Sequence, residues 1–130
     1  MQNRTIEDYC RLINKLDSGE GIKSAEISLG LGLSKITVSL TLQKLVSQKY
    51  VEKEKYGRVR LSNKGRKIAK KMDFRHRVLE TFLVSKIGMN KNHVHAEAHA
   101  LEHAASDGMI VKLYKFLGRP KYDPHGRKIL

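Results

Sequence analysis

Residues 34–62 read SKITVSLTLQKLVSQKYVEKEKYGRVRLS, and this stretch decides the fold of the first half of the chain. Ser34 belongs to the residue types that cap helices, and it precedes a run with helical periodicity, so the sequence predicts a helix that begins after it. Two β-prone runs follow and flank Tyr56 and Gly57, which is typical of a hairpin. The predicted core face of the helix consists of Val38, Leu42, Leu45 and Val46.

Two further helices are expected before this stretch. Apolar residues recur with helical spacing after Thr5, which we expect to be the N-cap, and Gly19 and Gly21 would end this first helix. A shorter second helix fits residues 24–29, with a break at residues 30–32. Helix, short helix, glycine turn, helix and basic hairpin is the order of a winged helix-turn-helix. The core face of the first helix is predicted to be Ile6, Tyr9, Ile13 and Leu16.

The chain is short and strongly basic. Its 130 residues are too few for a large multi-domain enzyme, and its net charge of +13 is typical of proteins that bind a polyanion such as nucleic acid. Residues 1–72 hold 16 basic and 7 acidic side chains, whereas residues 73–130 hold 10 and 6. We therefore predict a mainly α protein, in which a winged helix-turn-helix DNA-binding domain over residues 1–72 is followed by a helical domain over residues 73–130.

Neither a membrane nor an oxidising compartment is indicated. No apolar run approaches the roughly 20 residues that span a bilayer, and the first ten residues, MQNRTIEDYC, lack the apolar core of a signal peptide. The single cysteine, Cys10, cannot form an intrachain disulfide, which fits a reducing compartment, and we expect it to pack in the core. The expectation is a cytoplasmic protein without a membrane partner.

Two apolar side chains of the third predicted helix point away from its core face. At about 100° per residue, Ile36 lies ~160° and Leu40 ~200° from Val38, and such groups on a recognition helix can contact thymine methyl groups in the major groove. Short or cationic neighbours suit phosphate contacts, and the cations of the hairpin suit a clamp on the minor groove or the backbone. The alternative is a solvated basic hairpin beside a few exposed apolar residues. The predicted DNA-binding residues are Ser34, Lys35, Ile36, Thr37, Ser39, Leu40, Arg58 and Arg60, with Lys53 and Lys55 of the hairpin beside them.

Histidines are concentrated in the second half of the chain, and five of the six fall between residues 76 and 103. On a helix, four residues with metal-binding side chains share one arc of about 100°, whereas His93 and Glu97 face the other way and are expected to contact solvent. The four residues on the shared arc are His95, His99, Glu102 and His103.

A second pair of ligand types lies upstream. His76 and Glu80 are four residues apart on a long helix expected over residues 63–87, so both can converge on one ion. Imidazole and carboxylate together suit divalent first-row metals, among which this ligand set does not choose. The alternative for each residue alone is a surface or hydrogen-bonded side chain, and Glu80 could instead pair with Arg77 or Lys86.

Three segments, RHRVLETFL at 75–83, VHAEAHALEHAASD at 94–107 and YDPHGRKI at 122–129, resemble the diphtheria toxin repressor family of metal-dependent transcriptional regulators, which includes the manganese transport regulators. The resemblance implies a winged-helix DNA-binding domain and a helical metal-binding and dimerisation domain. It implies a homodimer that binds double-stranded operator DNA and represses metal-uptake genes with a divalent corepressor, Mn2+ or Fe2+, and with Zn2+, Co2+ or Ni2+ as substitutes in vitro. By its length the chain resembles the short members, and we expect it to lack the SH3-like domain of the longer ones.

The resemblance also carries ligand positions onto this sequence. The primary metal site of the family falls on Asp8, His99, Glu102 and His103, and the ancillary site falls on His76, Glu80 and His95. His99 stands where the iron branch has cysteine and the manganese branch glutamate, and Leu40 stands where the iron branch has glutamine, so neither the metal nor the operator sequence is carried over. Spacing alone also allows Asp8 to close a capping box with Thr5.

These assignments predict that the ion links the DNA-binding domain to the helical domain and so selects the orientations that fit DNA. Two alternatives from other classes remain at this point. One is a constitutive DNA-architectural protein whose histidines are structural. The other is a metallohydrolase, which the absence of an H-E-x-x-H motif disfavours. We therefore expect a protein that is not an enzyme.

Overall fold

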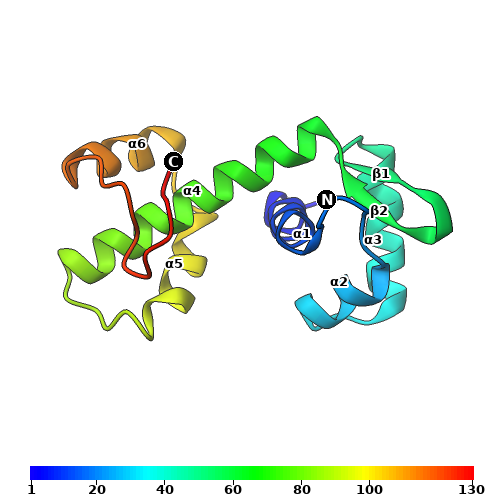
Figure 1. Ribbon diagram of the computed structural model, residues 1–130, viewed down its shortest axis with the longest axis horizontal. Coiled ribbons are helices and arrows are strands. Elements are labelled where there is room, and N and C mark those ends of the chain that lie inside the picture. The colour runs from blue at the N-terminus through cyan, green and yellow to red at the C-terminus, as the bar shows by residue number, and fades with distance from the viewer. The chain divides into compact units, whose positions relative to one another are not determined.

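The computed structural model describes residues 1–130, and most of them are helical (Figure 1). The predicted mainly α fold is confirmed. Contacts divide the chain into two compact units, Met1–Lys70 and Lys71–Leu130. In chain order the elements are α1 (Asn3–Leu16), α2 (Ser24–Leu31), α3 (Lys35–Ser47), β1 (Val51–Lys53), the 3-10 turn η1 (Lys55–Gly57), β2 (Val59–Leu61), α4 (Asn63–Ser85), α5 (Val94–Glu102) and α6 (Asp107–Phe116).

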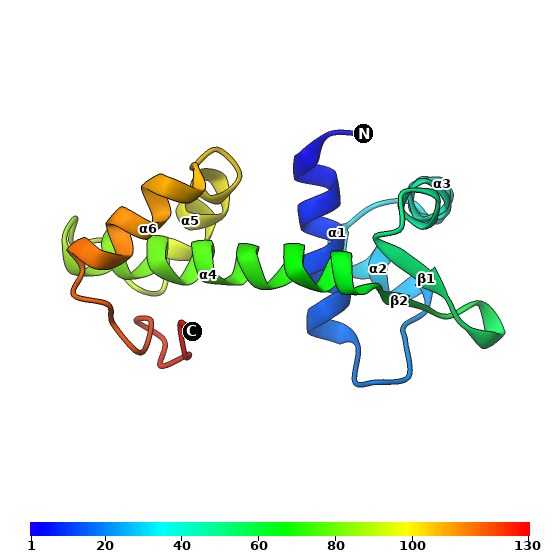
Figure 2. The same ribbon diagram turned by 90° about the horizontal axis from the view of Figure 1, so that it is seen from above.

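The first unit is a three-helix domain with a hairpin wing. β1 and β2 pair antiparallel, with Val51 opposite Leu61, and Ile22 adds an isolated bridge to Val59. Figure 2 shows this hairpin beside α2 and α3, with its turn extending from that end of the unit. The core contains six of the eight residues that periodicity predicts from α1 and α3, namely Ile6, Tyr9, Ile13, Val38, Leu42 and Leu45. Val46 is partly buried against this core, whereas Leu16 is 39% exposed, so its prediction as a core residue was wrong.

The start of α1 differs from the prediction. The helix begins at Asn3 with Gln2 at the N-cap, because the N–H groups of Thr5 and Ile6 already donate to the carbonyl oxygen of Gln2. Thr5 therefore lies inside the first turn, so its prediction as N-cap was wrong, and the capping box with Asp8 does not form.

Two other predicted helix ends move by two residues. α2 continues through Gly30 to Leu31 and ends at Gly32, whose positive φ of 66° forms a left-handed cap. Gly30 lies inside the helix, and its lack of a side chain allows α2 to pack closely on α1, since a Cβ atom there would lie 2.7 Å from Leu12. α4 stops at Ser85 rather than at residue 87.

In the second unit, α5 and α6 pack on the second half of α4, and the C-terminal segment returns to the same helix (Figure 1). The guanidinium of Arg77 donates to the carbonyl oxygen of Lys128 at 2.8 Å, and Ile129 joins the apolar core. No single helix is long and apolar enough to span a membrane; only the bent pair of α2 and α3 meets the length and composition together.

Cys10 lies in the core of the first unit and is fully buried, as predicted. Burial, with a smaller contribution from the charge of Glu7, raises the pKa of the Cys10 thiol to about 12. Since the thiolate is the reactive form, we expect the native protein to react with Ellman's reagent at pH 8 at least about 100 times more slowly than the protein unfolded in guanidinium. Cys10 is the only cysteine, so the absorbance reports on this site alone. Equal rates in the two states would contradict its burial.

Candidate metal centre and nucleic-acid interface

The predicted recognition helix α3 presents its outer face to solvent. The Ser34 hydroxyl caps the helix and accepts the backbone N–H of Thr37 at 3.1 Å. Ile36 and Leu40 are 75% and 55% exposed, so the two apolar side chains predicted to point outward do so. The remaining predicted contact residues of this helix, Lys35, Thr37 and Ser39, are exposed as well.

The side chains of Arg58 and Arg60 in the hairpin form hydrogen bonds within the protein. Arg58 donates to the carbonyl oxygen of Gly21 at 3.1 Å. Arg60 donates to the carbonyl oxygen of Gly19 at 2.8 Å and lies 3.4 Å from a carboxylate oxygen of Glu54. Both side chains thus tie the hairpin to the loop between α1 and α2. The exposed cations of the wing are Lys53 and Lys55.

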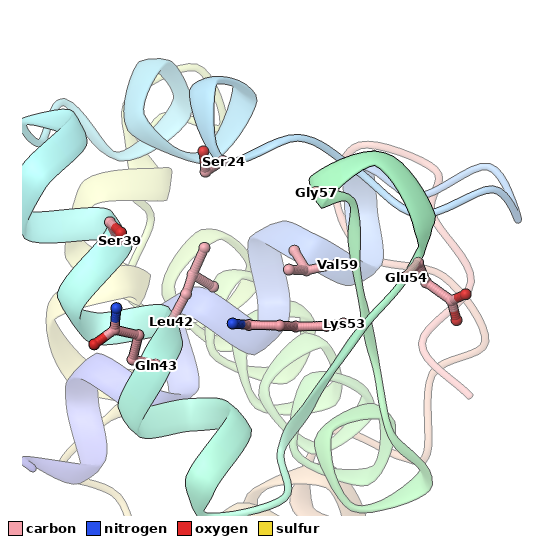
Figure 3. Close-up of a pocket in the computed structure, with 8 residues that line it drawn as sticks. All are labelled: Ser24, Ser39, Leu42, Gln43, Lys53, Glu54, Gly57 and Val59. Carbon is pink, nitrogen blue, oxygen red and sulfur yellow. The ribbon is translucent and has the colours of Figure 1, made fainter.

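A pocket of about 230 Å³ lies between α2, α3 and the wing. Figure 3 shows Lys53 extending across it toward α3, whereas Glu54 points away. With a single carboxylate and no histidine, the lining lacks a set of metal ligands. Its residues are Ser24, Ser39, Leu42, Gln43, Lys53, Glu54, Gly57 and Val59.

The second unit gathers His76, Glu80 and His95. α4 places His76 and Glu80 one turn apart, and both side chains are 1% exposed. His76 Nε2 lies 2.8 Å from Glu80 Oε1 without hydrogen-bond geometry, and the rings of His76 and His95 are 4.6 Å apart between centroids. Each of the three residues offers a ligand atom within 4.8 Å of the others. Because Glu80 is buried, the alternative in which it is an exposed surface acid is wrong.

A second group lies at the end of α5. Glu102 is completely buried, and its Oε1 lies 3.8 Å from His99 Nε2 and 4.0 Å from His103 Nε2. His103 follows the last residue of α5 with helical backbone angles, which keeps it on the arc that the sequence predicts. His93 and Glu97 are exposed, as expected. Asp8 lies partly buried on α1, where its carboxylate is 3.9 Å from Arg4 Nε; the resemblance assigns it to the primary site.

Buried carboxylates mark this unit as a candidate metal centre. An isolated carboxylate costs several kcal/mol to bury, and an imidazole compensates its charge only when it is protonated. Glu80 and Glu102 are 1% and 0% exposed, and Glu80 Oε2 has no hydrogen-bond partner. A divalent cation would neutralise both acids, and nitrogen with oxygen ligands suits such an ion. The donor set and the burial thus fit the metal that the resemblance implies.

Two residues of the C-terminal segment, Asp123 and His125, lie close to Glu80, and the sequence analysis did not identify them. His125 Nδ1 lies 3.5 Å from Glu80 Oε2, and Glu80, Asp123 and His125 also offer ligand atoms within 4.8 Å of one another. Asp123 Oδ1 accepts the N–H groups of His125 and Arg127 at 2.9 and 2.8 Å, while its buried Oδ2 has no hydrogen-bond partner. The segment YDPHGRKI contains both residues, but sequence spacing does not place it against α4.

Arg75 of α4 holds the junction between α5 and α6. Its buried guanidinium donates to the carbonyl oxygen of Glu102 at 3.0 Å and to that of Ala105, and it pairs with the carboxylate of Asp107. Lys71 Nζ lies 3.1 Å from the same carboxylate. The backbone that carries Glu102 is therefore anchored to the helix that carries His76.

The hydrogen bond from Arg75, and then that from Lys71, hold the pKa of Asp107 below its ordinary value. A lowered pKa in the folded state stabilises the protein above the pKa of the unfolded carboxyl, and this contribution is lost as the pH falls through the folded value. We expect Asp107→Asn to lower the melting temperature near neutral pH, and the difference from the wild type to shrink as the pH falls below about 4.

The matched control for that series is Glu97→Gln, which removes an exposed carboxylate of α5 in the same unit. Its melting temperature should stay close to that of the wild type at each pH. A difference between Asp107→Asn and the wild type that does not change with pH, measured by circular dichroism, would exclude the ion pair as its cause.

Comparison with known protein families gives a match for the DNA-binding part of the chain and another for its metal-binding part. The sequence model of the iron dependent repressor N-terminal DNA binding domain matches residues 1–59, and that of the iron dependent repressor metal binding and dimerisation domain matches residues 62–130. The chain belongs to the iron-dependent repressor family. The winged helix-turn-helix predicted from the element order is thus confirmed by fold and by family.

Individual members of this family are similar along most of the chain. The HTH-type transcriptional regulator MntR of Oceanobacillus iheyensis is 33% identical over 114 residues, which cover 87% of this chain and 77% of that protein. The diphtheria toxin repressor of Corynebacterium jeikeium is 35% identical over 127 residues, which cover 96% of this chain and 52% of that protein.

A solved structure titled as a manganese-dependent transcriptional repressor in complex with manganese matches 95% of this chain, with a TM-score of 0.85 and 37% identity. This chain spans 57% of that structure's length. The similarity therefore covers both units of this chain and a little over half of the larger repressor.

Proposed function

We propose that this family member is a metal-dependent transcriptional repressor of metal-uptake genes, which binds double-stranded operator DNA as a homodimer when Mn2+ or Fe2+ acts as corepressor. The observation that carries the proposal is the burial of Glu102 and Glu80 among histidines, in a unit whose family model describes metal binding and dimerisation. Zn2+, Co2+ and Ni2+ are expected to substitute in vitro.

The metal sites divide between two groups of residues. His99, Glu102 and His103 form the primary group, to which the resemblance adds Asp8, and His76, Glu80 and His95 form the ancillary group. The DNA-binding function is assigned to residues 1–72 and the metal-binding and dimerisation function to residues 73–130. In support of this division, the family models change between residues 59 and 62.

When bound, the metal supplies a divalent charge that neutralises the buried acids and holds their side chains in one arrangement. Glu102 and His103 would hold the ion from the end of α5, and the resemblance makes Asp8 of α1 a further ligand. Because Asp8 belongs to the DNA-binding half, a ligand role for it restricts the orientations of α3 to those that reach the major groove. By linkage, DNA then raises metal affinity by the same factor that metal raises DNA affinity.

The DNA contacts in this proposal come from α3 and the wing. Ile36 and Leu40 would contact base edges, while exposed polar and cationic neighbours would contact phosphates. Arg58 and Arg60 remain assigned to DNA, although the support for them is weaker because both already bond to loop carbonyls. The proposal includes a cytoplasmic location and no catalytic activity, supported by membership in a family of regulators.

Metal-dependent DNA binding tests the function. The DNA is taken from the promoter of a metal-transporter gene that lies next to the gene for this protein. Fluorescence anisotropy should show that Mn2+ or Fe2+ raises the affinity for this DNA at least about tenfold and that a chelator reverses the increase. DNA affinity that changes with neither metal nor chelator would instead support the alternative of a constitutive DNA-architectural protein. Metal-dependent cleavage of the DNA, or of ester and phosphoester substrates, would support the metallohydrolase.

A further inference from the structure

We propose that the outer face of the first turns of α4 is a second DNA-contact surface, which binds backbone phosphates of the DNA that flanks the operator. This proposal rests on the proposed function and adds residues that lie outside both the helix-turn-helix and the wing. Its basis is a run of cations on one exposed face of α4, which the DNA contacts assigned to α3 and the wing do not include.

The charge of this part of α4 is of one sign. Residues 63–72 contain five cations and no acid. Ile68 and Ala69 pack in the core of the first unit. At about 100° per residue, the five cations all fall within an arc of about 160° on the opposite side of the helix. These residues are Lys64, Arg66, Lys67, Lys70 and Lys71.

Two of these cations have no partner within the protein. Like charges three or four residues apart on a helix repel one another, which lowers stability unless an anion neutralises them. Lys64, Arg66 and Lys71 each donate to an oxygen of the protein. Lys67 and Lys70 are exposed and form neither a hydrogen bond nor an ion pair. Both are therefore free to bind an external anion.

The start of α4 lies beside the C-terminal end of the predicted recognition helix. Lys64 Nζ donates to the carbonyl oxygen of Gln48, the C-cap residue of α3, at 3.1 Å and lies 4.1 Å from the centroid of the Tyr50 ring. Lys44 and Lys49, at the same end of α3, are exposed as well. A major groove that receives α3 is bordered by a phosphate backbone on each side. We therefore expect the backbone beyond this end of α3 to lie nearest the α4 cations.

Phosphate contacts add affinity that does not depend on sequence and that falls as the salt concentration rises. Two duplexes that share one operator separate such contacts from those within the operator. The shorter duplex ends at the outermost bases whose methylation interferes with binding, and the longer one continues for about one helical turn, roughly ten base pairs, on each side. Both sequences come from the same promoter.

Anisotropy titrations in Mn2+ compare the wild type with the double substitution Lys67→Gln and Lys70→Gln. At about 50 mM salt the wild type should bind the longer duplex at least about tenfold more tightly than the shorter one, and the variant should bind both equally. On the longer duplex, the slope of log affinity against log salt should decrease by about one for each lysine that contacts a phosphate. On the shorter duplex the slope should not change.

Two controls separate this surface from net charge and from packing. Lys112→Gln with Lys115→Gln makes the same charge change on exposed residues with the same spacing on α6, and it should keep the preference for the longer duplex. Lys67→Arg with Lys70→Arg keeps the charge and should also keep the preference. An equal loss in the α6 variant, a loss in the arginine variant, or an unchanged preference in the Lys67 and Lys70 glutamine variant would each overturn the proposal.

The stability of the glutamine variant provides an independent measurement. Because the substitution removes repulsion and breaks no bond within the protein, its melting temperature by circular dichroism should equal or slightly exceed that of the wild type. If it melts lower, the arginine variant decides. A wild type that binds both duplexes equally in Mn2+ would overturn this surface alone, whereas DNA binding that Mn2+ does not stimulate on either duplex would refute the proposed function itself.

Discussion

Glu102→Gln is expected to lower Mn2+ affinity at the primary group by about 100-fold or more and to abolish the stimulation of DNA binding by metal. The substitution keeps the size of the side chain but removes the charge that attracts a cation. It also relieves the metal-free protein of a buried acid, so the fold should persist. Isothermal titration measures the affinity, and anisotropy with operator DNA measures the stimulation.

Glu97→Gln is the matched control, because it makes the same change on an exposed residue of the same helix. It should keep both the metal affinity and the metal response of the wild type. Retention of metal-stimulated DNA binding by Glu102→Gln would show that the buried carboxylate does not belong to the regulatory site.

The double substitution Ile36→Ala and Leu40→Ala is expected to weaken operator binding by between about tenfold and 100-fold, with little effect on binding to unrelated DNA. Contacts with base edges carry the sequence preference, and each is typically worth about 1–3 kcal/mol. Phosphate contacts are left in place, so the dependence of affinity on salt concentration should keep its slope. Anisotropy titrations at several salt concentrations, with operator and non-operator DNA, measure both quantities.

Leu29→Ala provides the control for this pair. Leu29 is 87% exposed on α2, outside the predicted recognition helix, so its loss removes exposed apolar surface without a base contact. A loss of operator affinity as large for Leu29→Ala as for the α3 pair, or an equal loss on unrelated DNA, would remove the assignment of Ile36 and Leu40 to sequence recognition.

Local periodicity was sufficient to predict the helices of the first unit and most of the residues that they bury. Val38, Leu42 and Leu45 repeat with the period of a helix, and this spacing also placed Ile36 and Leu40 outside. The end of α2 shows where local rules fail. Glycine is a residue type that favours a helix break, yet Gly30 lies inside α2, where its lack of a side chain allows close packing on Leu12. Contacts of this kind join segments that are distant in the sequence, and local periodicity does not predict them.

Contacts between segments that are distant in the sequence also account for the parts of the site that were not predicted. His76 and Glu80 are neighbours on one helix, as are His99 and Glu102, so helical geometry alone indicates both pairs. By contrast, the contact between His125 and Glu80 joins positions 45 residues apart, and the bond from Arg75 to the carbonyl of Glu102 joins positions 27 residues apart. Arg58 was expected to face DNA, but its bond to the carbonyl of Gly21 depends on how the wing meets the loop.

Anomalous diffraction from crystals of the Mn2+-loaded protein tests most directly whether one ion joins the two functional halves of the chain. Our account predicts an anomalous peak within coordination distance of carboxylate oxygens of Asp8 and Glu102 and of imidazole nitrogens of His99 and His103. A loaded form in which Asp8 is turned away from the ion, or in which no peak lies beside Glu102, would contradict it.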